Sequence, residues 1–425
     1  MLRAVLVIAG LLASPVMAQE LRGHGGPVRA LSVSADGMMA LSGSFDTSAI
    51  LWDLASSRAL AVLRGHDSAV NATLVLPDGR LATGGEDGKL LLWRMGGGTP
   101  DATLPGHEGP VAALALSPDG KLLGSASWDG TARITSLASG AGTQIVGHRG
   151  PVSAVAFAAD GRAVVTGGHD GTLRIASPEG ALQRAISAGR PIAGLAVARD
   201  GTLVAGGVDG MLLFFAADGT SLGEVRVGET PIVALALSPD GKRLAAAGIR
   251  GSVALVDMAA RSVERVLVGP GLPVWSVAFR PGTDELLTGG GDRLVRRWRV
   301  STGEHLGAVV MARPSDPATH FADHPGAEVF KACAACHTLG PDDGNRAGPT
   351  LHGVIGRRIG TASGYDYSPA LRGMDIVWSK ETIAALFDVG PTAYTPGTKM
   401  PEQRVVDPDE RKALVDFIAR ATGAE

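Results

Sequence analysis

A repeat of roughly 41 residues runs through most of the chain and limits its fold more than any other feature. Each unit begins at a glycine, which a histidine follows in the first four units: Gly23, Gly65, Gly106, Gly147, Gly189, Gly228 and Gly269. Short apolar stretches alternate with Asp-Gly type turns inside the units. Sheets built from such units hide their strand edges best when they close into a ring. The repeat therefore predicts an all-β propeller of seven blades over residues 19–310.

Three of these units carry a tryptophan near the end of their third predicted strand. The sequences are Leu51-Trp52-Asp53, Leu92-Trp93 and Arg297-Trp298, and the middle units lack the tryptophan. The units resemble WD40 repeats. That resemblance implies a hydrogen bond in each blade from the histidine to a turn aspartate, with the pairs His24–Asp46, His66–Asp87, His107–Asp129 and His148–Asp170. Since these pairs are spread around the ring, they are interpreted as structural and not as metal ligands or catalytic groups.

The segment that completes the seventh blade is left open by the sequence. Residues 304–310 follow the last unit directly, and residues 19–22 precede the first unit. Either segment has the length and apolar content of an outer strand, and both arrangements close seven blades.

A second motif, Cys333-Ala334-Ala335-Cys336-His337, lies at the start of the last quarter of the chain. Two cysteines separated by two residues and followed by histidine form the attachment signature for c-type haem. The two thiols form thioethers with the porphyrin vinyl groups, and the imidazole ligates the iron. These are the two cysteines of the chain, so no second pair is available for a zinc site. The motif predicts one covalently attached haem c.

A second axial ligand is expected downstream, in Thr395-Pro396-Gly397-Thr398-Lys399-Met400. The Pro-Gly turn suits a loop that crosses the other face of a haem. A His/Met ligand pair raises the reduction potential and suits electron transfer. His337 and Met400 are therefore the predicted ligands of the iron.

The motifs after residue 324 together resemble a class I cytochrome c, of the mitochondrial and bacterial cytochrome c2 type. They comprise CAACHT, GPTLHG around Pro349, GRR at 356–358, Gly364-Tyr365-Asp366-Tyr367, Trp378 and TPGTKM. The resemblance implies a small all-α domain in which the Pro349 carbonyl accepts a hydrogen bond from His337. It also implies that Arg357, Tyr367 and Trp378 bond to a haem propionate. Leu386 and Leu371 depart from the family, where a tyrosine and an asparagine are common.

The N-terminus has the pattern of a secretory signal peptide over residues 1–18. One arginine precedes an apolar run that is too short to cross a bilayer, and Val16 and Ala18 are the small residues at −3 and −1 of the expected cleavage site. The expected location is the periplasm, where c-type haem is attached in Gram-negative bacteria. We expect no membrane-spanning segment in the mature protein, a linker over the proline-containing residues 311–324, and the cytochrome domain over 325–425.

Charge excludes some classes of partner. The chain has 39 basic and 42 acidic residues, a net charge of −3, and no basic run that indicates a nucleic acid partner. The first hypothesis is a monohaem electron carrier, more a carrier than a catalyst, whose propeller docks a redox partner protein. Two alternatives stay open: a periplasmic redox enzyme whose propeller holds a substrate or second cofactor, and a scaffold that uses haem as a redox sensor.

Overall fold

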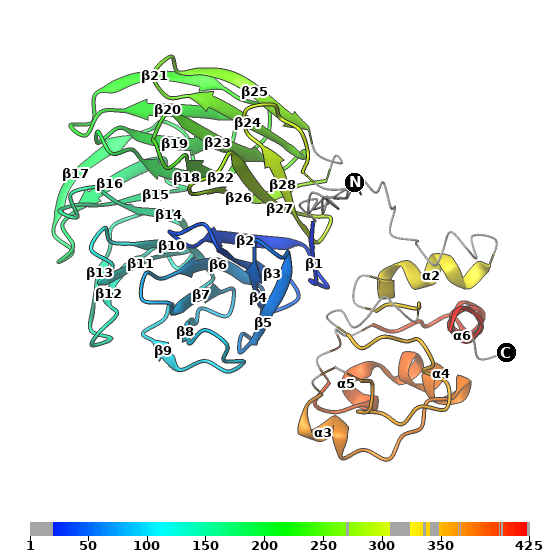
Figure 1. The fold of residues 1–425 in the computed structure, drawn as a ribbon. Coiled ribbons are helices and arrows are strands. Elements are labelled where there is room, and N and C mark those ends of the chain that lie inside the picture. The colour runs from blue at the N-terminus through cyan, green and yellow to red at the C-terminus, as the bar shows by residue number, and fades with distance from the viewer. Residues whose placement is uncertain are drawn as a thin grey trace, which may run out of the picture.

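The computed structural model describes residues 20–268, 272–306, 324–334, 337–340, 348–363, 365, 367–398, 400 and 403–422. Figure 1 shows a body made of strands, followed along the chain by a smaller helical body. The strands form seven antiparallel four-stranded sheets, so the prediction of a seven-bladed propeller followed by a helical domain is confirmed.

Each of the first three blades contains four consecutive strands, which follow one another from the centre of the ring outward. Blade 1 comprises β2 (Val28–Val33), β3 (Met39–Ser44), β4 (Ser48–Asp53) and β5 (Arg58–Arg64). Blade 2 comprises β6 (Val70–Val75), β7 (Leu81–Gly85), β8 (Leu90–Trp93) and β9 (Ala102–Leu104). Blade 3 comprises β10 (Val111–Leu116), β11 (Leu122–Ser127), β12 (Ala132–Ser136) and β13 (Gly142–Ile145).

The next three blades follow the same plan. Blade 4 comprises β14 (Val152–Phe157), β15 (Val164–Gly168), β16 (Thr172–Ala176) and β17 (Leu182–Ser187). Blade 5 comprises β18 (Ile192–Val197), β19 (Leu203–Gly207), β20 (Met211–Phe215) and β21 (Ser221–Arg226). Blade 6 comprises β22 (Ile232–Leu237), β23 (Arg243–Gly248), β24 (Ser252–Asp257) and β25 (Ser262–Val268).

Blade 7 joins the two ends of the propeller. Its strands are β26 (Val274–Arg280), β27 (Glu285–Gly290), β28 (Leu294–Arg299) and β1 (Leu21–Arg22), which pairs with β28 through Leu21↔Val295 and Arg22↔Leu294. His305 forms a separate bridge with Trp298. Both candidate closing segments therefore contribute, β1 at one end of β28 and His305 at the other, whereas residues 307–310 lie outside the described residues. The inner strands β26 and β2 are in contact, which closes the ring.

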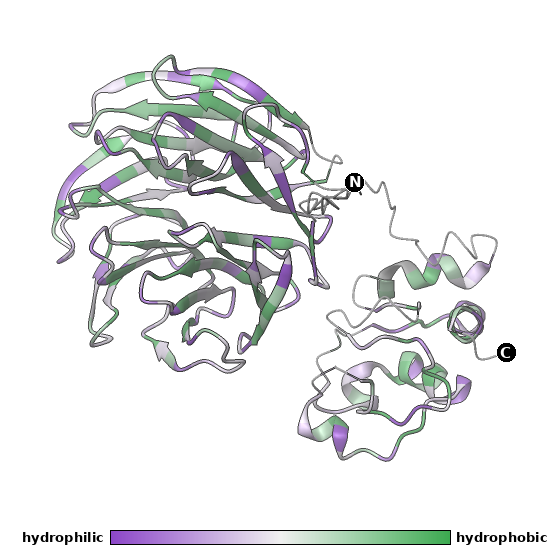
Figure 2. Ribbon diagram, in the orientation of Figure 1, coloured by the Kyte–Doolittle hydropathy of each residue, from purple (hydrophilic) through white to green (hydrophobic). Residues whose placement is uncertain are grey.

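Apolar side chains between the blades hold the ring together. The middle strands are almost wholly buried, and Trp52 and Trp93 are among the largest fully buried side chains. The outer strands β5, β17 and β21 are mostly exposed. Figure 2 shows the same division, with apolar residues along the strands and polar residues gathered in loops and on outer strands. Burial of apolar area between neighbouring sheets is thus the main stabilising term.

The described part of the second body contains five helices. They are α2 (Pro325–Ala334), α3 (Pro369–Arg372), α4 (Lys380–Val389), α5 (Pro391–Tyr394) and α6 (Pro408–Ala421). Local signals fix where α4 and α6 begin. Ser379 and Thr382 form a capping box before α4, and Asp407 accepts backbone hydrogen bonds before the proline that opens α6.

Helices α2 and α6 cross at close range. The rings of Phe330 and Phe417 lie 5.1 Å apart and are fully buried. Gly326 permits the approach, because a Cβ at this position would lie 2.7 Å from the Cβ of Phe417 and closer still to the backbone of Ala413. The predicted haem motif begins at Cys333, in the last turn of α2. Among the described residues, no helix is both long and apolar enough to cross a membrane.

Candidate functional site

The four Gly-His histidines each belong to a buried chain of hydrogen bonds inside one blade. Their Nδ1 atoms lie 2.9–3.1 Å from the turn aspartates, in the pairs His24–Asp46, His66–Asp87, His107–Asp129 and His148–Asp170. Their Nε2 atoms lie 2.7–2.8 Å from the hydroxyls of Ser42, Thr83, Ser125 and Thr166. The expected pairing is confirmed, and each imidazole is occupied at both nitrogens.

The hydroxyl partners were missed by the sequence reasoning, although a signal was present. Trp52 donates to Ser42, and Trp93 donates to Thr83, across the same ten-residue interval. A serine or threonine ten residues before the tryptophan is therefore the pattern that would have found Ser42 and Thr83, whereas blades 3 and 4 have no tryptophan at this position. Hydrogen bonds from His24 and Ser48 outweigh the burial that raises the pKa of Asp46, and the net result is a pKa of about 2. The aspartate is a charged acceptor that holds its turn in place.

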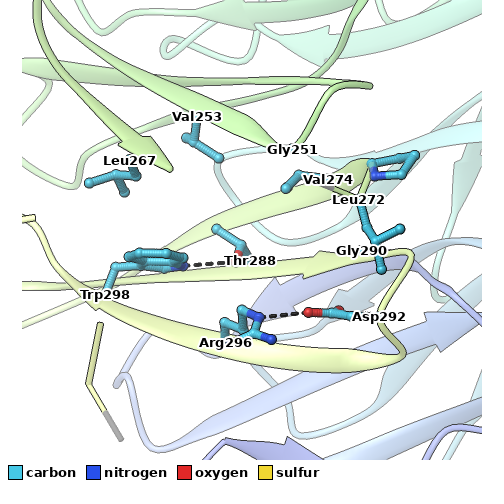
Figure 3. Close-up of a pocket in the computed structure, with 11 residues that line it drawn as sticks. Gly251, Val253, Leu267, Leu272, Val274, Thr288, Gly290, Asp292, Arg296 and Trp298 are labelled. Atoms are coloured by element: carbon cyan, nitrogen blue, oxygen red, sulfur yellow. Dashed lines mark hydrogen bonds and ion pairs between the residues drawn. The ribbon is translucent and has the colours of Figure 1, made fainter. Parts of the chain in front are cut away.

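Blade 7 keeps part of this arrangement without a histidine. Trp298 donates to Thr288 at 2.9 Å, and Asp292 pairs with Arg296 at 2.6 Å (Figure 3). The cavity beside these residues has about the size of one water molecule, so it does not hold a substrate or a second large cofactor. Within the described ranges, no group of three or more His, Cys, Asp or Glu side chains is placed to bind a metal ion.

The Cys-X-X-Cys-His motif begins in the last turn of α2. Cys333 is buried against the core of the helical domain, and Cys336 lies outside the described residues. The backbone N–H of His337 donates to the Cys333 carbonyl at 3.0 Å, which fixes the spacing of the two residues. The predicted attachment residue and the predicted ligand thus lie at the same edge of the domain.

The imidazole of His337 is held in one orientation. Its Nδ1 lies 2.7 Å from the carbonyl oxygen of Pro349, so Nδ1 donates and Nε2 is the nitrogen that would ligate a metal ion. Gly348 makes room for the ring, because a Cβ there would lie 2.8 Å from both ring nitrogens. The contact between His337 and Pro349 is the one that the family resemblance implies.

Arg357, Tyr367 and Trp378 come together beside this segment. The backbones of Arg357 and Trp378 are joined by a hydrogen bond of 3.0 Å, and Trp378 packs against the core. Arg357 donates to the carbonyls of Thr350 and His352, at 2.5 and 3.0 Å. Burial lowers the pKa of Arg357 and raises the pKa of Tyr367, and the interaction between these two groups opposes both shifts. A cation and a phenol in one partly buried place suit the binding of a carboxylate.

Met400 follows a closed turn on a different segment. Thr398 donates its backbone N–H to the carbonyl of Thr395, Gly397 adopts a φ of 83°, and the backbone of Met400 is bonded to the Thr398 hydroxyl at 3.1 Å. The Met400 side chain is half-buried against the same core that contains Cys333. Leu371 and Leu386, the two departures from the family pattern, are buried.

These residues fit a c-type haem. They provide the Cys333 thiol at the end of a helix, the His337 imidazole with a fixed tautomer and the Met400 thioether on a separate loop. Gly348 leaves space beside the imidazole ring. A methionine and a histidine on separate segments are the ligand set of an electron-transfer haem.

Comparison with known proteins agrees with both halves of the structure. The cytochrome c family model matches residues 324–422, and the model for the WD domain, G-beta repeat, matches residues 16–53, 57–94, 98–136, 142–176 and 261–299. These repeat matches leave out residues 177–260, which include blade 5 and most of blade 6.

Curated relatives resemble the C-terminal part. A cytochrome c of Ginkgo biloba is 36% identical over 115 residues, covering 27% of this chain and 96% of the relative. One from Arabidopsis thaliana is 40% identical over 98 residues, covering 23% and 87%. Cytochrome c 2.1 of Caenorhabditis elegans is 44% identical over 94 residues, covering 22% and 83%.

The domain therefore implies covalently bound haem c and electron transfer, and the propeller indicates protein interaction. The chain belongs to the cytochrome c family through its C-terminal domain, which it joins to a WD40-repeat propeller.

Proposed function

We propose that the protein is an exported monohaem electron carrier whose propeller docks a redox partner protein. The observation that carries the proposal is the fixed imidazole of His337, whose Nδ1 is occupied by the Pro349 carbonyl at 2.7 Å. A ligand held in this way does not need to reorganise between oxidation states, which favours fast single-electron transfer.

Each part of the site has a role in this proposal. Cys333 and Cys336 hold the haem covalently, and His337 and Met400 are its axial ligands. Pro349 orients the histidine, while Arg357, Tyr367 and Trp378 surround a propionate. When bound, haem c supplies a one-electron redox centre whose potential the ligands and their surroundings set. The small net charge of the chain suits a docking contact that is mostly apolar.

Export to the periplasm is part of the proposal, and its support is the signal-peptide pattern of residues 1–18. These residues lie outside the described part of the structure. The proposed protein has no nucleic acid partner and is not an integral membrane protein after cleavage.

Optical spectra and a metal count on the haem-loaded protein test the proposal. We expect one haem per chain, a weak sulfur-to-iron band at the red end of the oxidised spectrum, and no reaction of the reduced protein with carbon monoxide. Met400→Ala should remove the band and admit carbon monoxide. Met374→Ala is the matched control, since Met374 lies in the same domain outside the apolar core. A second haem or metal, or carbon monoxide binding by the unaltered protein, would instead favour a redox enzyme.

A further inference from the structure

One face of the propeller carries the turns between the second and third strands of every blade, and we call it the histidine face. It is formed by turns 45–47, 86–88, 128–130, 169–171, 208–210, 249–251 and 291–293, which contact the Gly-His segments in blades 1–4. The opposite face carries the turns between the first and second strands, such as the turn that ends at Met38. The two faces are separated by the length of a strand, about 20 Å.

The last of these turns contains an unusual residue. Arg293 has a φ of 67°, in the left-handed region. Blades 2–6 use glycine at the equivalent position, namely Gly88, Gly130, Gly171, Gly210 and Gly251, and blade 1 has Thr47 with a φ of 66°. A side chain in this conformation is less favourable than glycine. The two turns without glycine belong to blade 1 and blade 7, which meet at the closure of the ring.

The Arg293 side chain reaches the helical domain. Its guanidinium donates to the carbonyl oxygen of Ala334 at 3.4 Å. Ala334 lies between the two haem-attachment cysteines, Cys333 and Cys336. The strained turn of blade 7 thus touches the edge of the domain at which the haem is attached.

An aromatic and cationic cluster lies in blades 7 and 1 on the same face. The ring of Trp275 lies 6.4 Å from that of Phe45 in an edge-on arrangement, and the Arg29 guanidinium lies 5.0 Å above Trp275. Phe45 is 46% exposed. Arg29 and Trp275 both stand at the point where their inner strand shifts register, and such bulges turn side chains toward a rim. This surface is cationic and aromatic, and tryptophan and arginine are residue types enriched at interaction hot spots.

The tether between the two parts keeps a weak contact populated. Even fully extended, residues 307–323 span no more than about 60 Å. A short tether gives an effective concentration in the millimolar range, so a contact with a Kd of about 1 mM is formed roughly half of the time. No extensive interface is needed for the two domains of one chain to associate.

We propose that the histidine face at blades 7 and 1 docks the chain's own cytochrome domain at its haem-attachment edge. Arg293 is the polar anchor at Ala334, and Phe45 and Trp275 form the apolar part of the docking surface. An external redox partner then competes with the propeller for this edge of the haem domain. The propeller therefore controls access to the carrier as well as binding other proteins.

Photo-crosslinking of the full-length, haem-loaded protein tests this docking. A photoreactive phenylalanine analogue is placed at position 45 or, as the control, at position 38. Met38 is 48% exposed and lies at the other end of β3 from Phe45, on the opposite face. We expect cross-links within one chain from position 45 to peptides of residues 324–422, at a yield at least fivefold above that from position 38.

A second variant isolates the anchor. Arg293→Gly removes the guanidinium and places at this turn the residue that five other blades carry, so the fold is preserved. The yield from position 45 should fall severalfold in this variant. Equal yields from the two positions, cross-links only between chains, or a yield that Arg293→Gly leaves unchanged would overturn the proposal. The readout does not depend on redox activity, so it is separate from the test of the electron-carrier function.

Discussion

Gly348 gives the sharpest test of how the site is built. Replacing its hydrogen with a methyl group places a carbon 2.8 Å from both ring nitrogens of His337. Carbon and nitrogen atoms that are not bonded rarely come closer than about 3.4 Å, so the imidazole must move by roughly 0.6 Å or more. A movement of this size disturbs its 2.7 Å hydrogen bond to the Pro349 carbonyl.

The cost of Gly348→Ala follows from these two effects. Inserting a methyl group into a packed region costs about 1–3 kcal/mol, and losing one hydrogen bond of this kind costs about 1 kcal/mol. We therefore expect the free energy of unfolding of the cytochrome domain to fall by about 3 kcal/mol. For a domain of this size, that change lowers the urea midpoint by about 1.5 M.

Urea denaturation of the haem-loaded protein, followed by the Soret absorbance, measures this change. Gly373→Ala is the matched control, because a Cβ there meets its nearest atoms at 3.5 Å, an ordinary contact, and the φ of −83° suits alanine. We expect less than about 1 kcal/mol for the control. The oxidised spectrum should change in Gly348→Ala and not in Gly373→Ala, since only the first variant displaces a proposed ligand.

The reasoning is refuted if Gly348→Ala and Gly373→Ala unfold at the same urea concentration with the same oxidised spectrum. That result would mean that the His337 ring has free space around it and that the Pro349 carbonyl does not hold it.

Two further predictions concern the propeller. Burial lowers the pKa of His107 and of His148 below the ordinary 6.5, and hydrogen bonds hold the pKa of Asp46 at about 2 in place of 3.8. Below the ordinary pKa of each group, the unfolded chain therefore binds more protons than the folded chain. The contribution of the histidines to stability is complete above pH 6.5 and falls below it. Asp46 contributes about 2 kcal/mol, which is lost between pH 3.8 and 2. Urea unfolding followed by tryptophan fluorescence should show stability falling from pH 7 to 5, less steeply in His107→Gln/His148→Gln; an unchanged slope would contradict the assignment. Glu20 closes the ring by accepting from Arg22 and Arg296, both at 2.6 Å, with a side chain only 4% exposed. Glu20→Gln should lower the free energy of unfolding by about 3 kcal/mol, against less than about 1 kcal/mol for Glu264→Gln in the half-exposed Arg243 pair. Equal losses in the two variants would show that Glu20 does not hold the closure.

Much of the site follows from spacing along the chain. The Cys-X-X-Cys-His motif places its cysteines and histidine within about one helical turn, so local geometry determines their arrangement. The Gly-His and aspartate pairs recur with a fixed interval, and the structure brings each pair together as expected. Repetition located the histidines and the turn aspartates, and the resemblance to WD40 repeats implied that they pair.

Other contacts had no such signal. The sequence offered two segments for the outer strand of blade 7, and the structure uses both, with Glu20 of one segment bonded to Arg296. The hydroxyl partners of the histidines precede a tryptophan by ten residues in blades 1 and 2 only, and a lone serine or threonine has many other roles.

The number of blades, the position of the haem motif and the family of the second domain could all be predicted before any coordinates. These properties depend on period and on local spacing, which a chain carries wherever it folds. The closing strand, the space that Gly348 leaves for His337 and the contact of Arg293 with Ala334 emerged only from the folded chain. Each of these joins segments that are brought together by ring closure or by packing, and a pairing between distant segments leaves no periodic trace in either one.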